Sequence, residues 1–129
     1  MVDSTMNAER SNASTATVIE RFNDAFNRHD ADALAQWLTD DTVFEDTSPA
    51  PDGRRVEGKA AVVAFWRDWF VRNADSVFEA EDTIVAGDRV VVRWIYRKQR
   101  DGRPWHIRGV DVFRVRDGKV AEKLAYVKG

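Results

Sequence analysis

Asp111 is the residue whose surroundings most strongly suggest chemistry. Strand side chains alternate between two faces, and on that alternation Asp111 shares its face with apolar neighbours: Trp105, Ile107, Gly109, Phe113 and Val115. Burial among them disfavours the charged carboxylate. Such an acid either has a raised pKa and stays protonated, or it finds a cation or several hydrogen-bond donors. Both states are useful for acid–base chemistry.

Asp46 is the second candidate, because it shares a face of a short predicted strand, residues 42–47, with Phe44. An aromatic ring beside an acid suggests the rim of a cavity. Alternatively, Asp46 ends its strand and accepts hydrogen bonds from the backbone of the next loop, residues 48–53, which holds two prolines and a glycine. Alternation alone favours this structural role.

The register of the strands decides what lies against Asp111. A two-residue turn at residues 101–102 pairs Trp94 with Gly109, so the indole either roofs a space beside the acid or fills a gap in a curved sheet. A two-residue turn at residues 117–118 places Leu124 opposite Asp111, whereas a three-residue loop places Lys123 there. An inward Lys123 would pair with Asp111 and give that acid a structural role.

Composition excludes several classes of function. The 129 residues fit one domain, and 43% hydrophobic content with five Trp and seven Phe can form a substantial core. The 20 basic and 22 acidic residues form no long run of one sign, which argues against nucleic-acid and membrane-surface roles. Without cysteine or metal-ligand spacing we expect no metal, and the sequence carries no nucleotide-binding motif. No apolar stretch approaches about 20 residues and no signal peptide is evident, so we expect a soluble cytoplasmic protein.

The periodicity predicts the α+β class. We expect a flexible tail over residues 1–13 and one domain over residues 14–129, with helices from residue 14, over residues 31–38 and after Gly58. The apolar stripe of the first helix is Val18, Phe22, Ala25 and Phe26, and that of the third is Val62, Phe65, Trp66, Trp69 and Phe70. Three two-residue turns then predict four antiparallel strands over residues 77–86, 89–100, 103–116 and 119–127.

The segments NRHDADAL, TVFEDTS, VEGKAAVVAFW and GVDVFRVRDGKV, in this order, resemble the nuclear transport factor 2-like superfamily. Within it, the chain is similar to the SnoaL-like polyketide cyclases and the ketosteroid isomerases. The resemblance implies a cone-shaped, curved antiparallel sheet with three helices on its concave face. It also implies an apolar cavity between helices and sheet, no cofactor, and often a homodimer formed through the sheet.

The resemblance also implies roles for individual residues. Asp111 matches the cavity acid of both families, which is an acid/base in the cyclases and a protonated hydrogen-bond donor in the isomerases. Asp46 matches the isomerase general base. Phe22 stands where the isomerases have a tyrosine, so steroid isomerisation is disfavoured, and Tyr96 is a candidate replacement. We expect the substrate to contact Phe22, Phe26, Phe44, Trp66, Trp94, Tyr96, Trp105 and Phe113.

The working hypothesis is therefore an isomerase or lyase that moves a proton next to a carbonyl in a small apolar substrate, with Asp46 as base and Asp111 as neutral donor. The alternative is a non-catalytic ligand-binding or dimer scaffold, because a fold alone does not determine function. A homodimer is expected through the outer sheet face, whose apolar positions alternate with arginines: Val91, Ile95, Val110 and Val112 with Arg89, Arg93, Arg97, Arg108 and Arg114.

Overall fold

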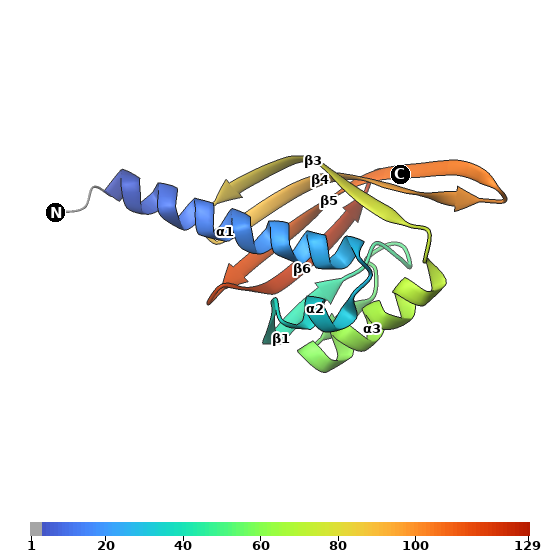
Figure 1. Ribbon diagram of the computed structural model, residues 1–129, viewed down its shortest axis with the longest axis horizontal. Coiled ribbons are helices and arrows are strands. Elements are labelled where there is room, and N and C mark those ends of the chain that lie inside the picture. The colour runs from blue at the N-terminus through green and yellow to red at the C-terminus, as the bar shows by residue number, and fades with distance from the viewer. Residues whose placement is uncertain (1–3) are drawn as a thin grey trace.

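The computed structural model describes the backbone of residues 4–129 and the side chains of residues 14–129. Three helices come first: α1 (Ser4–Asn27), α2 (Ala31–Ala35) and α3 (Lys59–Arg72). The strands are β1 (Leu38–Glu45), β2 (Arg55–Glu57), β3 (Val77–Ala86), β4 (Arg89–Arg100), β5 (Arg103–Arg116) and β6 (Lys119–Val127). The helices lie on one side of a twisted sheet, and the β4–β5 hairpin projects beyond the body (Figure 1). The α+β prediction is confirmed.

The six strands form one sheet in the order β2-β1-β6-β5-β4-β3. Strands β3 to β6 have the predicted bounds and are antiparallel neighbours. At both Asp-Gly turns, Asp101-Gly102 and Asp117-Gly118, the two central residues have positive φ, as a type I′ hairpin requires. The sheet is mostly antiparallel. Two features were not anticipated from the sequence, namely the short strand β2 and the parallel pairing of β1 with β6.

The second helix and the first strand differ from the predicted bounds. Helix α2 ends at Ala35 and β1 begins at Leu38, so Leu38 is a strand residue and not the end of a helix. The change follows from pairing, because the amide of Val120 donates to the carbonyl of Trp37 at 2.7 Å and draws this segment into the sheet. Leu38 is buried in the strand. A hydrophobic residue at the end of a core-facing helix would be buried too, so its hydrophobicity did not distinguish helix from strand.

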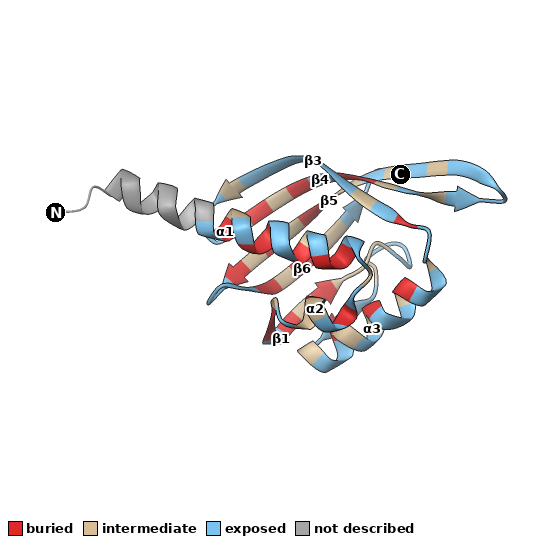
Figure 2. Cartoon of the chain, in the orientation of Figure 1, coloured by how far each residue is buried: buried red, intermediate tan, exposed pale blue. Residues whose placement is uncertain are grey.

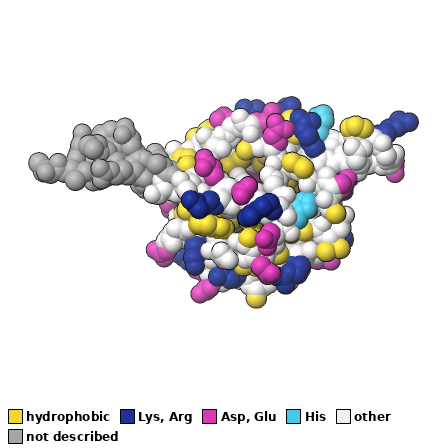
Figure 3. Space-filling model, in the orientation of Figure 1, with side chains coloured by type: hydrophobic (Ala, Val, Ile, Leu, Met, Phe, Trp, Pro, Cys, Tyr) yellow, Lys and Arg dark blue, Asp and Glu magenta, His cyan; other side chains and the backbone are white. Residues whose placement is uncertain are grey.

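Helix α1 begins at Ser4, before the predicted start at residue 14. Residues 1–3 lie outside the described part of the chain, and the division into tail and domain stays a prediction. Among the described residues, no helix combines the length and hydrophobicity that a membrane crossing requires. On the face shown in Figure 3, acidic and basic side chains are interspersed around hydrophobic ones.

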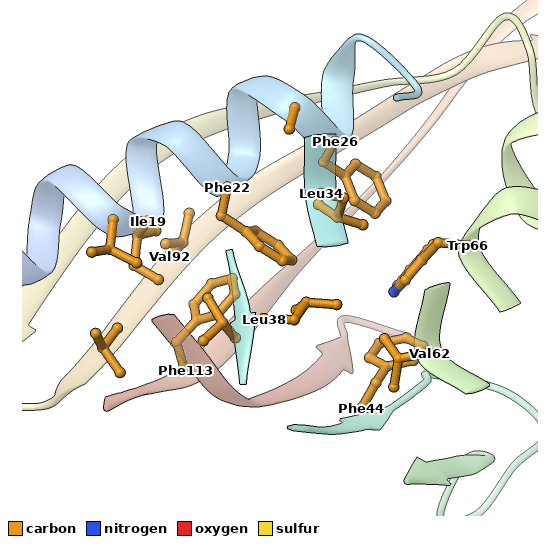
Figure 4. Packing of buried hydrophobic residues seen from close by; sticks show 14 of the residues in the cluster. Ile19, Phe22, Phe26, Leu34, Leu38, Phe44, Val62, Trp66, Val92 and Phe113 are labelled. Atoms are coloured by element: carbon orange, nitrogen blue, oxygen red, sulfur yellow. The ribbon is translucent and has the colours of Figure 1, made fainter. Parts of the chain in front are cut away.

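The core lies between the helices and the sheet, where the buried residues of Figure 2 gather. All four predicted residues of the α1 stripe are buried. In Figure 4, Phe22 of α1 faces Phe113 of β5, with ring centroids 5.5 Å apart. Trp66 of α3 packs over Phe44 of β1 at 4.5 Å. These contacts fix α1 and α3 on the same sheet at two separate places.

The register between β4 and β5 is as predicted, with Trp94 opposite Gly109 and Val92 opposite Asp111. Gly109 is crowded. A Cβ atom there would lie 2.3 Å from the carbonyl oxygen of Tyr126 and 2.5 Å from two carbons of the Trp94 ring. The glycine therefore lets the indole lie flat against the sheet, beside Asp111.

We expect Gly109→Ala to destabilise the protein by about 1–3 kcal/mol, because either the indole or the β5–β6 backbone must move. Urea denaturation followed by tryptophan fluorescence measures the change. Gly129→Ala is the matched control, since nothing lies within 4 Å of a Cβ at that position. An unchanged unfolding midpoint for Gly109→Ala would show that the indole has space to move.

Candidate functional site

A register shift in β6 determines which side chain meets Asp111. The turn at Asp117-Gly118 has two residues, and Val115 pairs with Val120, but Arg114 pairs with Glu122. The extra residue, Ala121, is a β-bulge, and it reverses the alternation of the rest of the strand. Ala125 therefore lies opposite Asp111 and Lys123 lies opposite Phe113. Neither predicted pairing is correct, yet Lys123 does face inward.

Lys123 and Asp111 form a buried ion pair. The Nζ of Lys123 lies 3.8 Å from Oδ2 of Asp111, and the two residues are only 6% and 5% exposed. Five aromatic rings lie around the ammonium, with centroids 4.5–5.9 Å from Nζ: Phe22, Phe26, Phe44, Trp66 and Phe78. We call these rings the aromatic cage. Their π faces stabilise a cation that has lost its hydration.

Burial has opposite effects on the two partners. It raises the pKa of the Asp111 carboxyl, and the Lys123 ammonium and the Trp94 indole oppose only part of that effect. It lowers the pKa of the Lys123 ammonium, opposed in part by the charges of Asp111 and Asp46. Both shifts favour the uncharged form of each group, so the pair is poised for proton transfer between its members.

A cavity of about 520 Å³ borders this pair, and we call it the large cavity. Both predicted acids line it, together with five of the predicted aromatic residues: Phe44, Trp66, Trp94, Tyr96 and Trp105. A volume of this size suits a small organic molecule. A second cavity of about 50 Å³ lies on the other side of the ion pair, against α1 and β3.

The other three predicted contact residues lie elsewhere. Phe26 lines the small cavity, while Phe22 and Phe113 line neither cavity and pack against each other. Phe22 does reach the site indirectly, because its ring is part of the aromatic cage.

Asp46 follows the last residue of β1 and lies half-buried at the wall of the large cavity. Its Oδ1 accepts a hydrogen bond from the amide of Thr47 at 2.7 Å, which fixes the carboxyl. The next loop packs closely on it, since a Cβ on Gly53, where φ is +79°, would lie 1.8 Å from the Asp46 carbonyl oxygen. Asp46 thus lies at the end of its strand and in the cavity wall, but its carboxyl accepts from the amide of Thr47 and not from the loop at residues 48–53 as the structural alternative predicted.

Further polar groups complete the wall. The indole Nε1 of Trp94 is buried and acts on the Asp111 carboxyl, whose pKa it lowers, but it makes no hydrogen bond of normal geometry to any group in the part of the chain that the structure describes. Such an unsatisfied donor costs free energy unless a ligand accepts from it. The hydroxyl of Tyr96 donates to Oδ1 of Asn73 at 3.3 Å, and Nζ of Lys98 donates to the same oxygen at 2.9 Å. Sequence reasoning missed Lys98 and Asn73, which only the fold brings to the cavity.

Metal ligands are not grouped in this site. Within residues 14–129, no three His, Cys, Asp or Glu side chains lie together as a metal site requires. His29 is remote from the large cavity, with its Nε2 3.0 Å from the carbonyl of Ser76. The prediction that the protein needs no metal or cofactor stays a prediction.

Residues 19–123 match the family model of the SnoaL-like domain. The chain belongs to the SnoaL-like domain family. Among solved structures it is similar to a nuclear transport factor 2-like protein of unknown function from Mesorhizobium loti. The two sequences are 40% identical, and the structures superpose with a TM-score of 0.80 over 92% of this chain and 93% of that one. The family recognised from sequence is thus confirmed. A search of curated proteins finds no match.

Several other similar structures carry functional descriptions. A proposed polyketide cyclase from Sinorhizobium meliloti is 26% identical, with a TM-score of 0.70, over 84% of this chain and 93% of that one. A proposed ketosteroid isomerase from Kribbella flavida is 15% identical, with a TM-score of 0.76, over 92% and 80% of the two chains. At that identity the second comparison concerns the fold alone.

The buried pair of this SnoaL-like domain predicts a specific pattern of stability. We expect Lys123→Met and Asp111→Asn each to cost about 3–5 kcal/mol, because each leaves one buried charge unpaired, whereas the double variant recovers most of the loss. Chemical denaturation measures the cycle. The exposed pair Asp24–Arg28 is the control, and its single variants should cost less than about 1 kcal/mol.

The same single variants should respond to pH in opposite directions. In Lys123→Met, the raised pKa of Asp111 means that stability is highest below the ordinary value of 3.8 and falls as pH rises through the folded-state pKa. In Asp111→Asn, the lowered pKa of Lys123 means that stability increases with pH from the folded-state pKa up to the ordinary value of 10.5. Parallel pH profiles would contradict the burial of these two charges.

Proposed function

We propose that this SnoaL-like domain is a cofactor-independent enzyme of isomerase or lyase type that moves a proton next to a carbonyl group. The substrate is a small, mainly apolar molecule of polyketide, terpenoid or steroid type. The observation that carries the proposal is that Asp46 and Asp111 line one open cavity with aromatic walls. A cavity packed solid by tryptophans would instead favour a scaffold.

Asp46 is the base in this proposal. It lies at the cavity wall, and its half-buried carboxyl uses one oxygen to hold the amide of Thr47. That bond orients the group, and the second oxygen is available to take a proton from a carbon next to the carbonyl. A carboxylate positioned in this way needs no cofactor to form an enolate.

Asp111 and the groups around it stabilise the enolate oxygen. Protonated Asp111 donates a hydrogen bond, and burial favours that form. Lys123 offers an N–H donor whichever partner holds the shared proton. The indole N–H of Trp94, which acts on the same carboxyl without a hydrogen bond of normal geometry, is a further donor, and it compensates for the hydroxyl that Phe22 lacks. Aldol-type ring closure and allylic isomerisation both pass through such an enolate.

The base can be tested with phenylacetone, an apolar ketone, in deuterated solvent. We expect Asp46→Asn to slow exchange of the protons next to the carbonyl by about 10² or more while ligand affinity is largely kept, because Asn keeps the shape but cannot accept the proton. Asp111→Asn still offers an N–H and should lose about 10- to 1000-fold. Mass spectrometry of the ketone gives the rate.

Asp52→Asn is the matched control, since Asp52 is exposed in the loop after Asp46 and does not line the large cavity. Equal and small effects of Asp46→Asn and Asp111→Asn, with binding unchanged, would contradict catalysis. That result would support the alternative of a non-catalytic ligand-binding or scaffold domain.

We also propose a homodimer formed through the outer face of the sheet. Val91, Val110 and Val112 are half-buried there, while Ile95 is already 3% exposed in the single chain. Arginines of this face pair with neighbouring acids, as in Arg97–Glu79 at 3.3 Å and Arg89–Glu122 at 3.2 Å. An apolar centre with a charged rim is the usual composition of an interface.

Sedimentation should therefore show a dimer at tens of micromolar, about the range in which a specific interface persists. Val112→Asp places a charge at the centre of the face and should yield a monomer. Val71→Asp, at a position 77% exposed on α3, should leave the dimer intact. A wild-type monomer at that concentration would contradict the proposed homodimer.

A further inference from the structure

Lys123 is placed as a nucleophile would be. Its side chain lines the large cavity, its ion-pair partner Asp111 is 3.8 Å away, and the rings of the aromatic cage lie around Nζ. A lysine that served only to neutralise Asp111 would need no access to a cavity of about 520 Å³. The geometry thus brings an amine, a proton-transfer partner and space for a ligand to one point.

We propose that Lys123 forms a Schiff base with an aldehyde or ketone held in the large cavity. The inference shares with the proposed function only the assumption that the ligand carries a carbonyl group. It adds covalent chemistry at a residue that has no role of this kind in the reaction described above.

An amine attacks a carbonyl only with its lone pair free, so the proton of Lys123 must first move to Asp111. The low-dielectric surroundings favour this transfer, because burial raises the pKa of the carboxyl and lowers the pKa of the ammonium. The transfer changes no net charge in the cavity. The resting ion pair and the neutral pair are therefore two forms of the same two residues.

Lys123 and Asp111 supply every proton and electron pair that the reaction with the carbonyl group needs. The Lys123 nitrogen bonds to the carbonyl carbon while the C=O π electrons move to oxygen, and Asp111 gives its proton to that oxygen. One proton then passes from nitrogen to the hydroxyl group, which leaves as water while the nitrogen lone pair forms the C=N bond. The products are a protonated imine, the Asp111 carboxylate and one water molecule.

The site stabilises this product as it stabilises the resting state. An iminium cation beside the Asp111 carboxylate repeats the charges of the ion pair, and the aromatic cage faces either cation. The iminium also makes the neighbouring C–H bonds more acidic. Asp46, whose charge already acts on Lys123, is the carboxylate in the same cavity that can remove such a proton and leave an enamine.

Reductive trapping tests the proposal. The full chain is incubated at pH 7.4 with benzaldehyde and sodium cyanoborohydride, and the adduct is located by peptide mass spectrometry. An ordinary lysine with a pKa of about 10.4 is about 0.1% neutral at this pH, and each decrease of one in pKa raises that fraction about tenfold. We expect Lys123 to be modified at least about tenfold faster than the internal controls Lys59, Lys119 and Lys128, which do not line the large cavity.

Variants separate this inference from the proposed function. Benzaldehyde has no proton next to its carbonyl, so trapping in Asp46→Asn should equal the wild-type rate, even if phenylacetone exchange is lost. Lys123→Arg keeps the cation but forms no Schiff base, and it should lose the fast adduct while thermal unfolding shows that it is folded. Modification of Lys123 no faster than the control lysines would overturn the proposal. Trapping without exchange would overturn the proposed function alone.

Discussion

The carboxyl of Asp111 and the ammonium of Lys123 occupy a place where neither is well hydrated, so each depends on the other and on the packing around both. Removing two ions from water costs several kcal/mol for each ion, and their attraction offsets that cost only with good geometry. The supporting rings come from every layer of the fold: Phe26 from α1, Trp66 from α3, Phe44 from β1 and Phe78 from β3. The pair thus links the orientations of α1 and α3 to the chemistry of the cavity.

A core of this size does not need a buried charge for stability, since apolar side chains of similar volume often serve equally well. The packing on the two sides of the pair differs accordingly. Toward the core, Phe22 and Phe113 fill the space, whereas toward β4 and β5 the wall opens into the large cavity. Buried ionisable groups at the border of an open cavity are common at sites of catalysis. The asymmetry favours a functional explanation of the pair over a structural one.

The sequence predicted the elements that have strong local signals. The apolar stripes sufficed for the presence and buried faces of α1 and α3, and the three two-residue turns sufficed for the bounds of β3 to β6. The residue of β4 that lies opposite Asp111 was predicted correctly, because the turn at Asp101-Gly102 is regular. The predicted partner of Asp111 in β6 was wrong, because nothing in the local composition distinguishes the bulge at Ala121 from ordinary alternation. The β1–β6 pairing is a contact between distant segments, which periodicity does not encode.

The bulge at Ala121 determines which side chain of β6 reaches the centre of the site. Beyond that residue, side chains point to the sheet face opposite to the one that regular alternation would assign, so Lys123 contacts the aromatic cage and Leu124 lies on the outer face. Regular pairing through Ala121, in a chain of the same length, would exchange the two and present leucine to Asp111 and lysine to solvent. Deletion of Ala121 would instead remove the bulge and leave Lys123 opposite Phe113. The residue at the centre of the site thus depends on a backbone irregularity that no letter of the motif records.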